Sequence, residues 1–452
     1  MNALNKLKTV QSDLQPTPVV IPVEAYISAD YARDEKEKLW AKVWQVACRE
    51  EELPNVGDYV TYDILDQSVI VVRSATDQIS AYYNVCRHRG RRLTKGCGNT
   101  SRFTCKFHGW QWNIQGENEK VLDEQDWGDA LNADNLKLGT IKTGTWGGYV
   151  FINFDPQSET LEEYLQSVPA WLDPFEIDKM RYRWRQWLYF PCNWKVALEA
   201  FIESYHVPAT HPQLLKFGAT KSWSRAHGKH SCMGLGTLGE DMAGGGTTAI
   251  NTKAGIDPRK LIADFMQHLL DTVNANTTQT IVDAAKKLVD VLPEGTHPDL
   301  VSAKMMEMAA MADAERGIIW PNIDPEHFAE SGIDWHVFPN TIILHGVTFI
   351  LGYRARPNGV DPDSCIFEVY VLERFPEGQE PKPENVYQPD ISEDKWRLVL
   401  TQDFNNMSEV QAGVKSWSFP GMRPNPKQEQ SVINFHRNLA DYMGTGAPKP
   451  IA

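Results

Sequence analysis

The sequence lacks the features that would tie it to a membrane or to an oxidising compartment. No apolar run reaches the roughly 20 residues that a transmembrane helix needs, and the polar first residues do not form a signal-peptide pattern. The chain has seven cysteines, an odd number without disulfide-like spacing. We therefore expect a cytoplasmic protein with free thiols and no membrane partner.

The sequence also lacks an excess of positive charge. It has 45 Lys and Arg against 59 Asp and Glu, a net charge of −14 over 452 residues. Because nucleic acids are bound mainly through cationic side chains, this balance excludes a nucleic acid as the expected partner. An acidic surface could instead meet a basic patch on a redox partner. The length allows two or more domains, and 15 Trp residues predict aromatic-rich cores or pockets.

Two short Cys/His pairs carry the strongest signal: Cys86-x-His88 and, after sixteen residues, Cys105-x-x-His108. A structural zinc site is the alternative, but zinc ribbons usually bring their first two ligands as Cys-x-x-Cys. In a Rieske 2Fe–2S cluster two cysteines hold one iron and two histidines hold the other. The pattern predicts such a cluster on two neighbouring loops. The other cysteines are expected to be free and mostly buried: Cys48, Cys97, Cys192, Cys232 and Cys365.

Short strands surround these pairs. Alternating or β-branched segments predict strands at 59–64, 69–73, 79–84 and 149–154. An all-β domain over about 44–155 follows from them. Residues 1–43 form an N-terminal segment with an amphipathic helix, which we expect to pack with the catalytic domain.

The rest of the chain, 156–452, predicts an α+β catalytic domain. Helical patterns alternate with later strands at 335–338, 341–345, 349–354 and 366–374, which is typical of an antiparallel sheet covered by helices. An insertion at about 234–314 is rich in glycine at first and helix-like from residue 257 onward. We expect it to form either a cap over the pocket or a surface that contacts another subunit.

A second metal site is predicted between Asn193 and Pro212. The pattern indicates a helix up to Val207, ended by Pro208, with Glu199, Glu203 and His206 on one face. His211 then lies in the turn beyond. The alternative is a polar helix face with two surface histidines.

Asp403 is the best candidate for a third, carboxylate ligand, which would complete a two-His-one-carboxylate triad. It lies within the apolar stripe of a helix that begins near Ser392, and a carboxylate there is costly to bury unless it is paired or metal-bound. The alternative is an error in helix phase, with Asp403 in solvent. The stripe consists of Trp396, Val399, Leu400, Met407, Val410 and Val414.

Together, Cys-x-His, Cys-x-x-His and the later Asn-Trp-Lys…Glu-x-x-His-x-x-x-x-His-Pro segment resemble the large catalytic subunit of Rieske non-haem iron oxygenases, the ring-hydroxylating oxygenases. The resemblance covers nearly the whole chain. It implies an N-terminal Rieske domain and a C-terminal helix-grip domain with mononuclear Fe(II). It also implies O2 as co-substrate and electrons from NAD(P)H through a separate reductase, often with a ferredoxin. The implied assembly is a head-to-tail homotrimer, with a small β subunit left open.

By this resemblance, His206, His211 and Asp403 bind the iron. Glu203 occupies the position of a carboxylate that bridges the first of these histidines to a cluster histidine of the next subunit. Many members have Asp there, and the longer side chain is found in members that resemble choline and carnitine monooxygenases. Ala200 stands where several ring dioxygenases have Asn or Gln. Both departures weaken a transfer of dioxygenase chemistry to this chain.

The resulting expectation is the terminal oxygenase component of a multicomponent system for the catabolism of aromatic hydrocarbons. Its substrate would be an apolar aromatic or alicyclic compound, with monooxygenation and dioxygenation both open. One alternative within the family is an oxidative demethylase or quaternary-amine monooxygenase. An alternative of another class is a non-catalytic iron–sulfur or zinc protein that carries electrons.

Overall fold

The computed structural model describes residues 12–217, 221–235, 246–247 and 256–451. The chain divides into two compact units. One consists of 33–164 with 358–360; the other consists of 1–32, 165–357 and 361–452. Among the described residues, no helix is both long and apolar enough to cross a membrane.

The smaller unit is built on a seven-stranded antiparallel sheet in the order β2-β11-β10-β5-β4-β3-β6. Its strands are β2 (Gln45–Arg49), β3 (Asp58–Ile64), β4 (Gln67–Ala75), β5 (Gln78–Tyr83), β6 (Cys97–Asn99), β10 (Thr140–Trp146) and β11 (Tyr149–Asn153). The expected strands lie within β3 and β4 or overlap β5 and β11, each running one residue past the end of the latter two. Gly147 and Gly148 join β10 to β11 with φ angles of 58° and 76°, because a tight two-residue hairpin needs positive φ at both positions.

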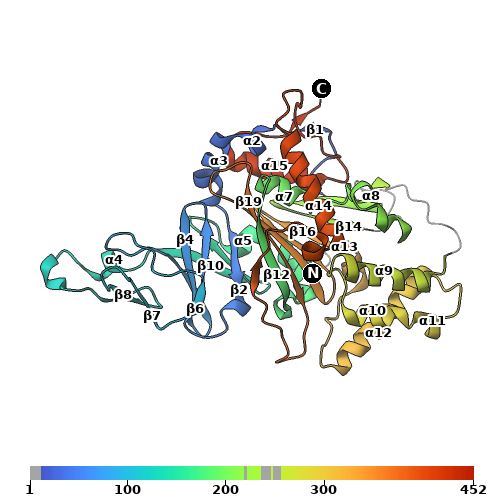
Figure 1. Cartoon of the computed structure of the whole chain (residues 1–452), viewed down its shortest axis with the longest axis horizontal. Helices are drawn as coiled ribbons and strands as arrows, with labels where there is room; N and C mark the ends of the chain where they lie inside the picture. Colours follow the sequence, from blue (N-terminus) through green and yellow to red (C-terminus); the bar gives the residue numbers. More distant parts are fainter. Residues whose placement is uncertain (1–11, 218–220, 236–245, 248–255, 452) are drawn as a thin grey trace, which may run out of the picture. The chain divides into compact units, whose positions relative to one another are not determined.

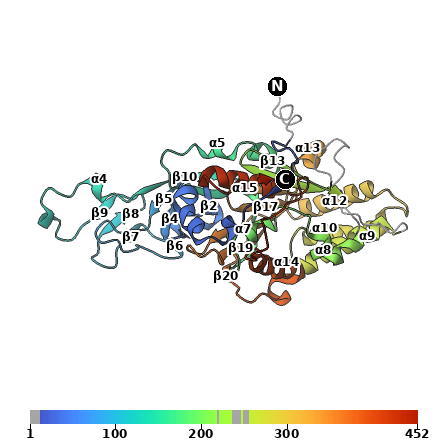
Figure 2. The same ribbon diagram turned by 90° about the horizontal axis from the view of Figure 1, so that it is seen from above.

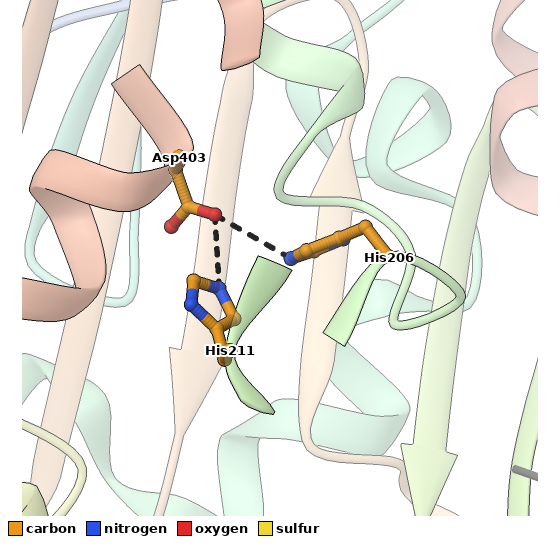
Figure 3. Close-up of side chains that lie close together, drawn as sticks. All are labelled: His206, His211 and Asp403. Carbon is orange, nitrogen blue, oxygen red and sulfur yellow. Dashed lines mark ion pairs between the residues drawn. The ribbon is translucent and has the colours of Figure 1, made fainter. Parts of the chain in front are cut away.

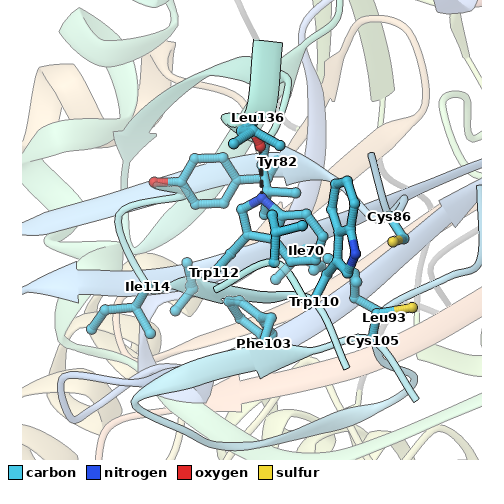
Figure 4. Packing of buried hydrophobic residues seen from close by; sticks show 13 residues of the cluster. Ile70, Tyr82, Cys86, Leu93, Phe103, Cys105, Trp110, Trp112, Ile114 and Leu136 are labelled. Carbon is cyan, nitrogen blue, oxygen red and sulfur yellow. Dashed lines mark hydrogen bonds between the residues drawn. The ribbon is translucent and has the colours of Figure 1, made fainter. Parts of the chain in front are cut away.

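A second, three-stranded sheet carries the second Cys/His pair, which lies between its first two strands. It consists of β7 (Arg102–Thr104), β8 (Gln111–Asn113) and β9 (Asn118–Lys120). Between the sheets lies an aromatic core in which Trp112 is fully buried and its indole N–H donates to the Leu136 carbonyl at 2.8 Å. Cys86 and Cys105 belong to the same buried cluster (Figure 4). The core therefore fixes the base of both loops.

The larger unit contains a nine-stranded sheet in the order β15-β13-β14-β16-β17-β18-β19-β12-β20, antiparallel except for the β12/β20 pair (Figure 1). Its strands are β12 (Arg181–Phe190), β13 (Lys221–His227), β14 (His230–Leu235), β15 (Gly246–Thr247), β16 (Asp334–Val337), β17 (Thr341–His345), β18 (Phe349–Pro357), β19 (Cys365–Glu373) and β20 (Asn385–Tyr387). The fold class expected from the sequence, an all-β domain followed by an α+β domain, is confirmed.

Helices cover both faces of this sheet. On one face lie α7 (Trp194–Glu199), α14 (Glu393–Gly413) and α15 (Gln430–Met443), where Phe404 of α14 packs against Phe367 of the sheet. On the other face, Trp171 of α6 (Val168–Leu172) packs against Trp335. The β1 strand (Val19–Val20) near the N-terminus pairs with β21 (Lys449–Pro450) near the C-terminus of the same unit.

The insertion forms a helical cluster of its own. It consists of α9 (Pro258–Thr272), α10 (Gln279–Lys286), α11 (Leu288–Val291) and α12 (Pro298–Glu315), which lie side by side (Figures 1 and 2). A separate apolar core, with Leu288, Val301 and Ala309 at its centre, holds α10, α11 and α12 together. Most of the glycine-rich first part, 236–245 and 248–255, lies outside the described residues.

The helix expected over 193–207 is wrong in its length. It ends at Glu199, the next helix, α8, spans only Val207–Thr210, and the residues between them form turns. Glu199, Glu203 and His206 therefore do not share a face of one helix. The helical periodicity of the apolar residues in this segment came partly from Phe201 and Ile202, which are buried because the turn itself packs inward.

Candidate metal centres

The two Cys/His pairs lie on loops of matching design. Each loop follows a short strand, and the Cys carbonyl accepts the N–H of a glycine four residues on: Cys86 with Gly90 at 3.1 Å and Cys105 with Gly109 at 2.9 Å. Both glycines have φ near 70°, a left-handed conformation that glycine adopts without a steric penalty. The structure therefore brings together the four residues that the spacing singled out.

The side chains of these loops present the right donor atoms. Burial raises the pKa of the Cys86 thiol, and the neighbouring Cys105 thiol raises it further. The imidazole rings of His88 and His108 lie 4.6 Å apart between centroids. Their Nδ1 atoms are buried and find no hydrogen-bond partner among the described residues. Two adjacent sulfurs and two unpaired imidazole nitrogens fit a cluster held by two Cys and two His.

The second set of ligands also converges. His206, His211 and Asp403 offer donor atoms that lie within 4.8 Å of one another (Figure 3). Asp403 Oδ1 is 2.9 Å from His211 Nε2 and 3.6 Å from His206 Nε2. Asp403 is 4% exposed, so the alternative of a solvated Asp403 is wrong. The helix around it begins after Ser392 as expected.

The other ring nitrogen of each histidine is held by a side chain. His206 Nδ1 is 2.7 Å from Glu203 Oε1, and His211 Nδ1 is 2.9 Å from Gln402 Oε1. When Nδ1–H donates to these oxygens, each Nε2 keeps its lone pair for a metal ion, as in most protein metal sites. A set of two imidazoles and one carboxylate, which leaves the other coordination positions of a bound metal ion open, suits non-haem Fe(II).

Electrostatics at the triad also favours a bound cation. Burial lowers the pKa of His206, but the carboxylates of Glu203 and Asp403 outweigh this effect and raise it to about 9. A proton on His206 thus takes the place that a metal ion would occupy between these carboxylates.

Glu203 is held more firmly than a surface glutamate. It is 8% exposed, and its Oε2 accepts the backbone N–H groups of Tyr205 and His206, the latter at 3.2 Å. It also lines a pocket of about 270 Å³, together with His206, Asp403 and Ala200. The alternative of a solvated Glu203 is therefore wrong. Among the described residues, none that lines this pocket belongs to the helical insertion, so the expected cap does not cover this side.

Sequence reasoning missed Gln402 and Glu429 beside the triad and the side chains that bind Glu199. Gln402 precedes Asp403 on α14, but nothing in a single sequence distinguishes it from an ordinary helix residue. Glu199 is bonded to Tyr26 Oη at 2.9 Å and to His436 Nε2 at 2.6 Å, and these partners are far apart in the chain. Burial, with a contribution from Glu203, raises the pKa of Glu429 to about 7, and this carboxyl lines the same pocket.

Two family models match the chain. Residues 43–129 match the Rieske [2Fe–2S] domain, and residues 175–445 match the catalytic domain of the ring-hydroxylating alpha subunit. The first range contains both Cys/His pairs. The second contains the His–His–Asp triad and the nine-stranded sheet.

The chain is also similar to individual members of these families, at low sequence identity. The oxygenase subunit of carnitine monooxygenase from Escherichia coli K12 is 29% identical over 212 residues, which are 46% of this chain. The match spans 56% of that relative, somewhat over half its length. A quaternary ammonium Rieske monooxygenase with bound L-carnitine superposes with a TM-score of 0.63 at 18% identity, covering 95% of this chain and 97% of the other. Naphthalene 1,2-dioxygenase with bound indole gives 0.62 at 18% identity, covering 99% and 96%.

Proposed function

The chain belongs to the family of ring-hydroxylating oxygenase alpha subunits and is a Rieske-type oxygenase, and we propose that it is the terminal component of a multicomponent system. In this proposal, His206, His211 and Asp403 hold a catalytic Fe(II) ion. The observation that carries it is their convergence within 4.8 Å, with both Nδ1 atoms already engaged by other side chains. An electron carrier would not need this second site.

A bound Fe(II) ion would supply the activation of O2, since three protein ligands leave coordination positions open. The side chains around it have defined tasks. Glu203 and Gln402 fix the two imidazole rings and their tautomers. Asp403 would supply the negative charge that holds a divalent cation in a buried site.

We further propose that Cys86, His88, Cys105 and His108 hold the Rieske cluster and that a separate reductase or ferredoxin supplies its electrons. The similar E. coli protein is itself named an oxygenase subunit, which supports such a system. Glu203 would link His206 to His108 of the next subunit in a homotrimer, because its pocket-facing carboxylate is placed to accept a second imidazole N–H.

An isotope experiment tests the oxygenase function. Protein with both metal sites filled would be reduced with dithionite, freed of reductant and exposed to ¹⁸O2 with apolar and cationic compounds as candidate substrates. We expect at least one product to carry ¹⁸O after a single turnover. Oxidation of the reduced cluster without any labelled product across the series would contradict the proposal.

The substrate class has two candidates. The abundant aromatic side chains and the naphthalene 1,2-dioxygenase likeness support an apolar aromatic compound. A specific feature supports a cationic one: Asp334 is 3% exposed and its Oδ1 has no hydrogen-bond partner among the described residues. Burial raises the pKa of this carboxyl well above its usual range. A buried carboxylate without a donor suits a quaternary ammonium group, which has positive charge but no N–H.

Strand register places Asp334 on the face of the sheet that bears the triad. Asp334 pairs with Leu344, which pairs with Leu351, and Tyr353 lies two residues further along the same strand. Because side chains alternate along a strand, all four share one face. Phe201, from the turn that precedes His206, stacks on Tyr353 with 4.0 Å between ring centroids.

Asp334→Asn separates the two substrate classes. The change keeps the side-chain shape but cannot form the carboxylate that a bound cation would stabilise, so we expect the dissociation constant of L-carnitine or another quaternary ammonium compound to rise about tenfold or more. Binding of indole, which carries no charge, should not change. Calorimetric titration of the wild type and of Asp334→Asn with each ligand measures both dissociation constants. Equal loss of both ligands would show a structural role for Asp334, and no loss of either would favour the aromatic class.

A further inference from the structure

The charge of the smaller unit is distributed unevenly around the two Cys/His loops. A groove of about 610 Å³ lies beside them, and none of the described residues that line it has a carboxylate. Five exposed cations do: Arg91, Arg92, Lys95, Arg102 and Lys106. This concentration of positive charge contrasts with the net charge of the whole chain, which is −14.

The nearest carboxylates neutralise the groove only in part. Asp63 lies 3.5 Å from the Arg92 guanidinium, and Glu119 lies 3.8 Å from that of Arg102. All four side chains are exposed by a third or more, and ion pairs of this kind are weak in water. The remaining charge is available to an approaching molecule.

The groove is joined to the cysteine side of the loops. Its floor contains Leu93 and Phe103, which belong to the same buried cluster as Cys86 and Cys105 (Figure 4). The Arg91 carbonyl accepts the Cys86 N–H at 2.8 Å, and Lys106 directly follows Cys105. The histidine side is different: neither His88 nor His108 lines the groove.

We propose that this groove is the docking surface for an acidic electron-donor protein. The inference rests on the proposed Rieske cluster. Electrons then enter the cluster on its cysteine side. They leave on its histidine side, where the proposed route through Glu203 begins. Complementary charge steers such an encounter and raises its rate without requiring tight binding. The net charge of the chain would predict a basic partner, and the local charge reverses that expectation.

A reduced plant-type [2Fe–2S] ferredoxin is a suitable probe, because its potential lies below that of Rieske clusters. Stopped-flow absorbance would follow reduction of the oxidised cluster in the wild type and in the double variant Lys95→Glu/Arg102→Glu. We expect the second-order rate constant at low ionic strength to fall about tenfold or more. The difference should shrink towards zero near 1 M salt, where charges are screened within about 3 Å.

The matched control is Lys286→Glu/Lys287→Glu, which changes the net charge equally at two exposed lysines of the larger unit. Its rate constant should equal that of the wild type. Equal slowing in both double variants would overturn the proposal, since only the overall charge would then matter. So would a wild type that does not react with the ferredoxin.

Two further readouts separate docking from other roles. The mass of the assembly in solution and the rate at which O2 reoxidises the pre-reduced cluster should be unchanged in Lys95→Glu/Arg102→Glu. A smaller assembly or slower reoxidation would place the groove at a subunit contact and overturn the proposal. A wild type without a cluster spectrum would instead defeat the proposed function itself.

Discussion

Asp403→Ala is expected to lower turnover by more than about 100-fold. Even the loss of a side chain that only orients a metal ligand lowers metal affinity or activity by about 10–100-fold. Asp403 Oδ1 faces both imidazole Nε2 atoms. Without it, two neutral imidazoles remain to hold a divalent cation, and the iron should be lost. Product formation in a single turnover, with the iron content of each variant, measures the effect.

The control for this variant is Glu409→Ala, which removes an exposed carboxylate from the same helix. It should keep its iron and its turnover. The absorption spectrum of the cluster should be the same in both variants, because its proposed ligands belong to the other compact unit. Full activity in Asp403→Ala would show that the third ligand lies elsewhere.

Glu203→Gln is expected to slow turnover by about 10–100-fold even when both metal sites are filled. The carboxylate accepts from His206 Nδ1 at 2.7 Å and from two backbone N–H groups. An amide has one acceptor oxygen and an NH2 group that cannot accept. One of these contacts is therefore lost, and so is the second acceptor that a neighbouring imidazole would need.

Single-turnover kinetics from a pre-reduced cluster would show this effect directly. Glu203→Asp tests whether the longer reach matters and should be slow as well. Glu199→Gln is the matched control, since Glu199 lines the same pocket and has the same charge but contacts neither triad histidine. Wild-type rates in Glu203→Gln, at full metal occupancy, would show that electrons take another route.

Local spacing was sufficient to predict the elements that depend on neighbours in the chain. The Cys/His loops could be recognised because the two ligands of each pair lie within four residues of each other. Asp403 could be placed because apolar residues that are buried, Leu400 and Met407, lie one turn before and one turn after it, although Val410 of the expected stripe is exposed. Four strands of each unit followed from short β-branched or aromatic segments: β3, β4, β5 and β11 in the smaller unit and β16, β17, β18 and β19 in the larger unit.

Other features depend on contacts that the sequence does not display. The helix that begins at Trp194 stops at Glu199, and the next residues turn so that Phe201 can stack on Tyr353. The apolar pattern alone would have continued the helix. Glu199 meets His436 across more than 200 residues. The basic groove is likewise invisible in the net charge, because it depends on how a few cations are gathered by the fold.

Iron and sulfide analysis of the purified protein tests the central claim, that one chain holds two different metal centres. After anaerobic reconstitution, the account predicts about three irons and two sulfides per wild-type chain and about two of each in Asp403→Ala, with one cluster spectrum in both. Two irons in the wild type, or no loss of iron in Asp403→Ala, would contradict it.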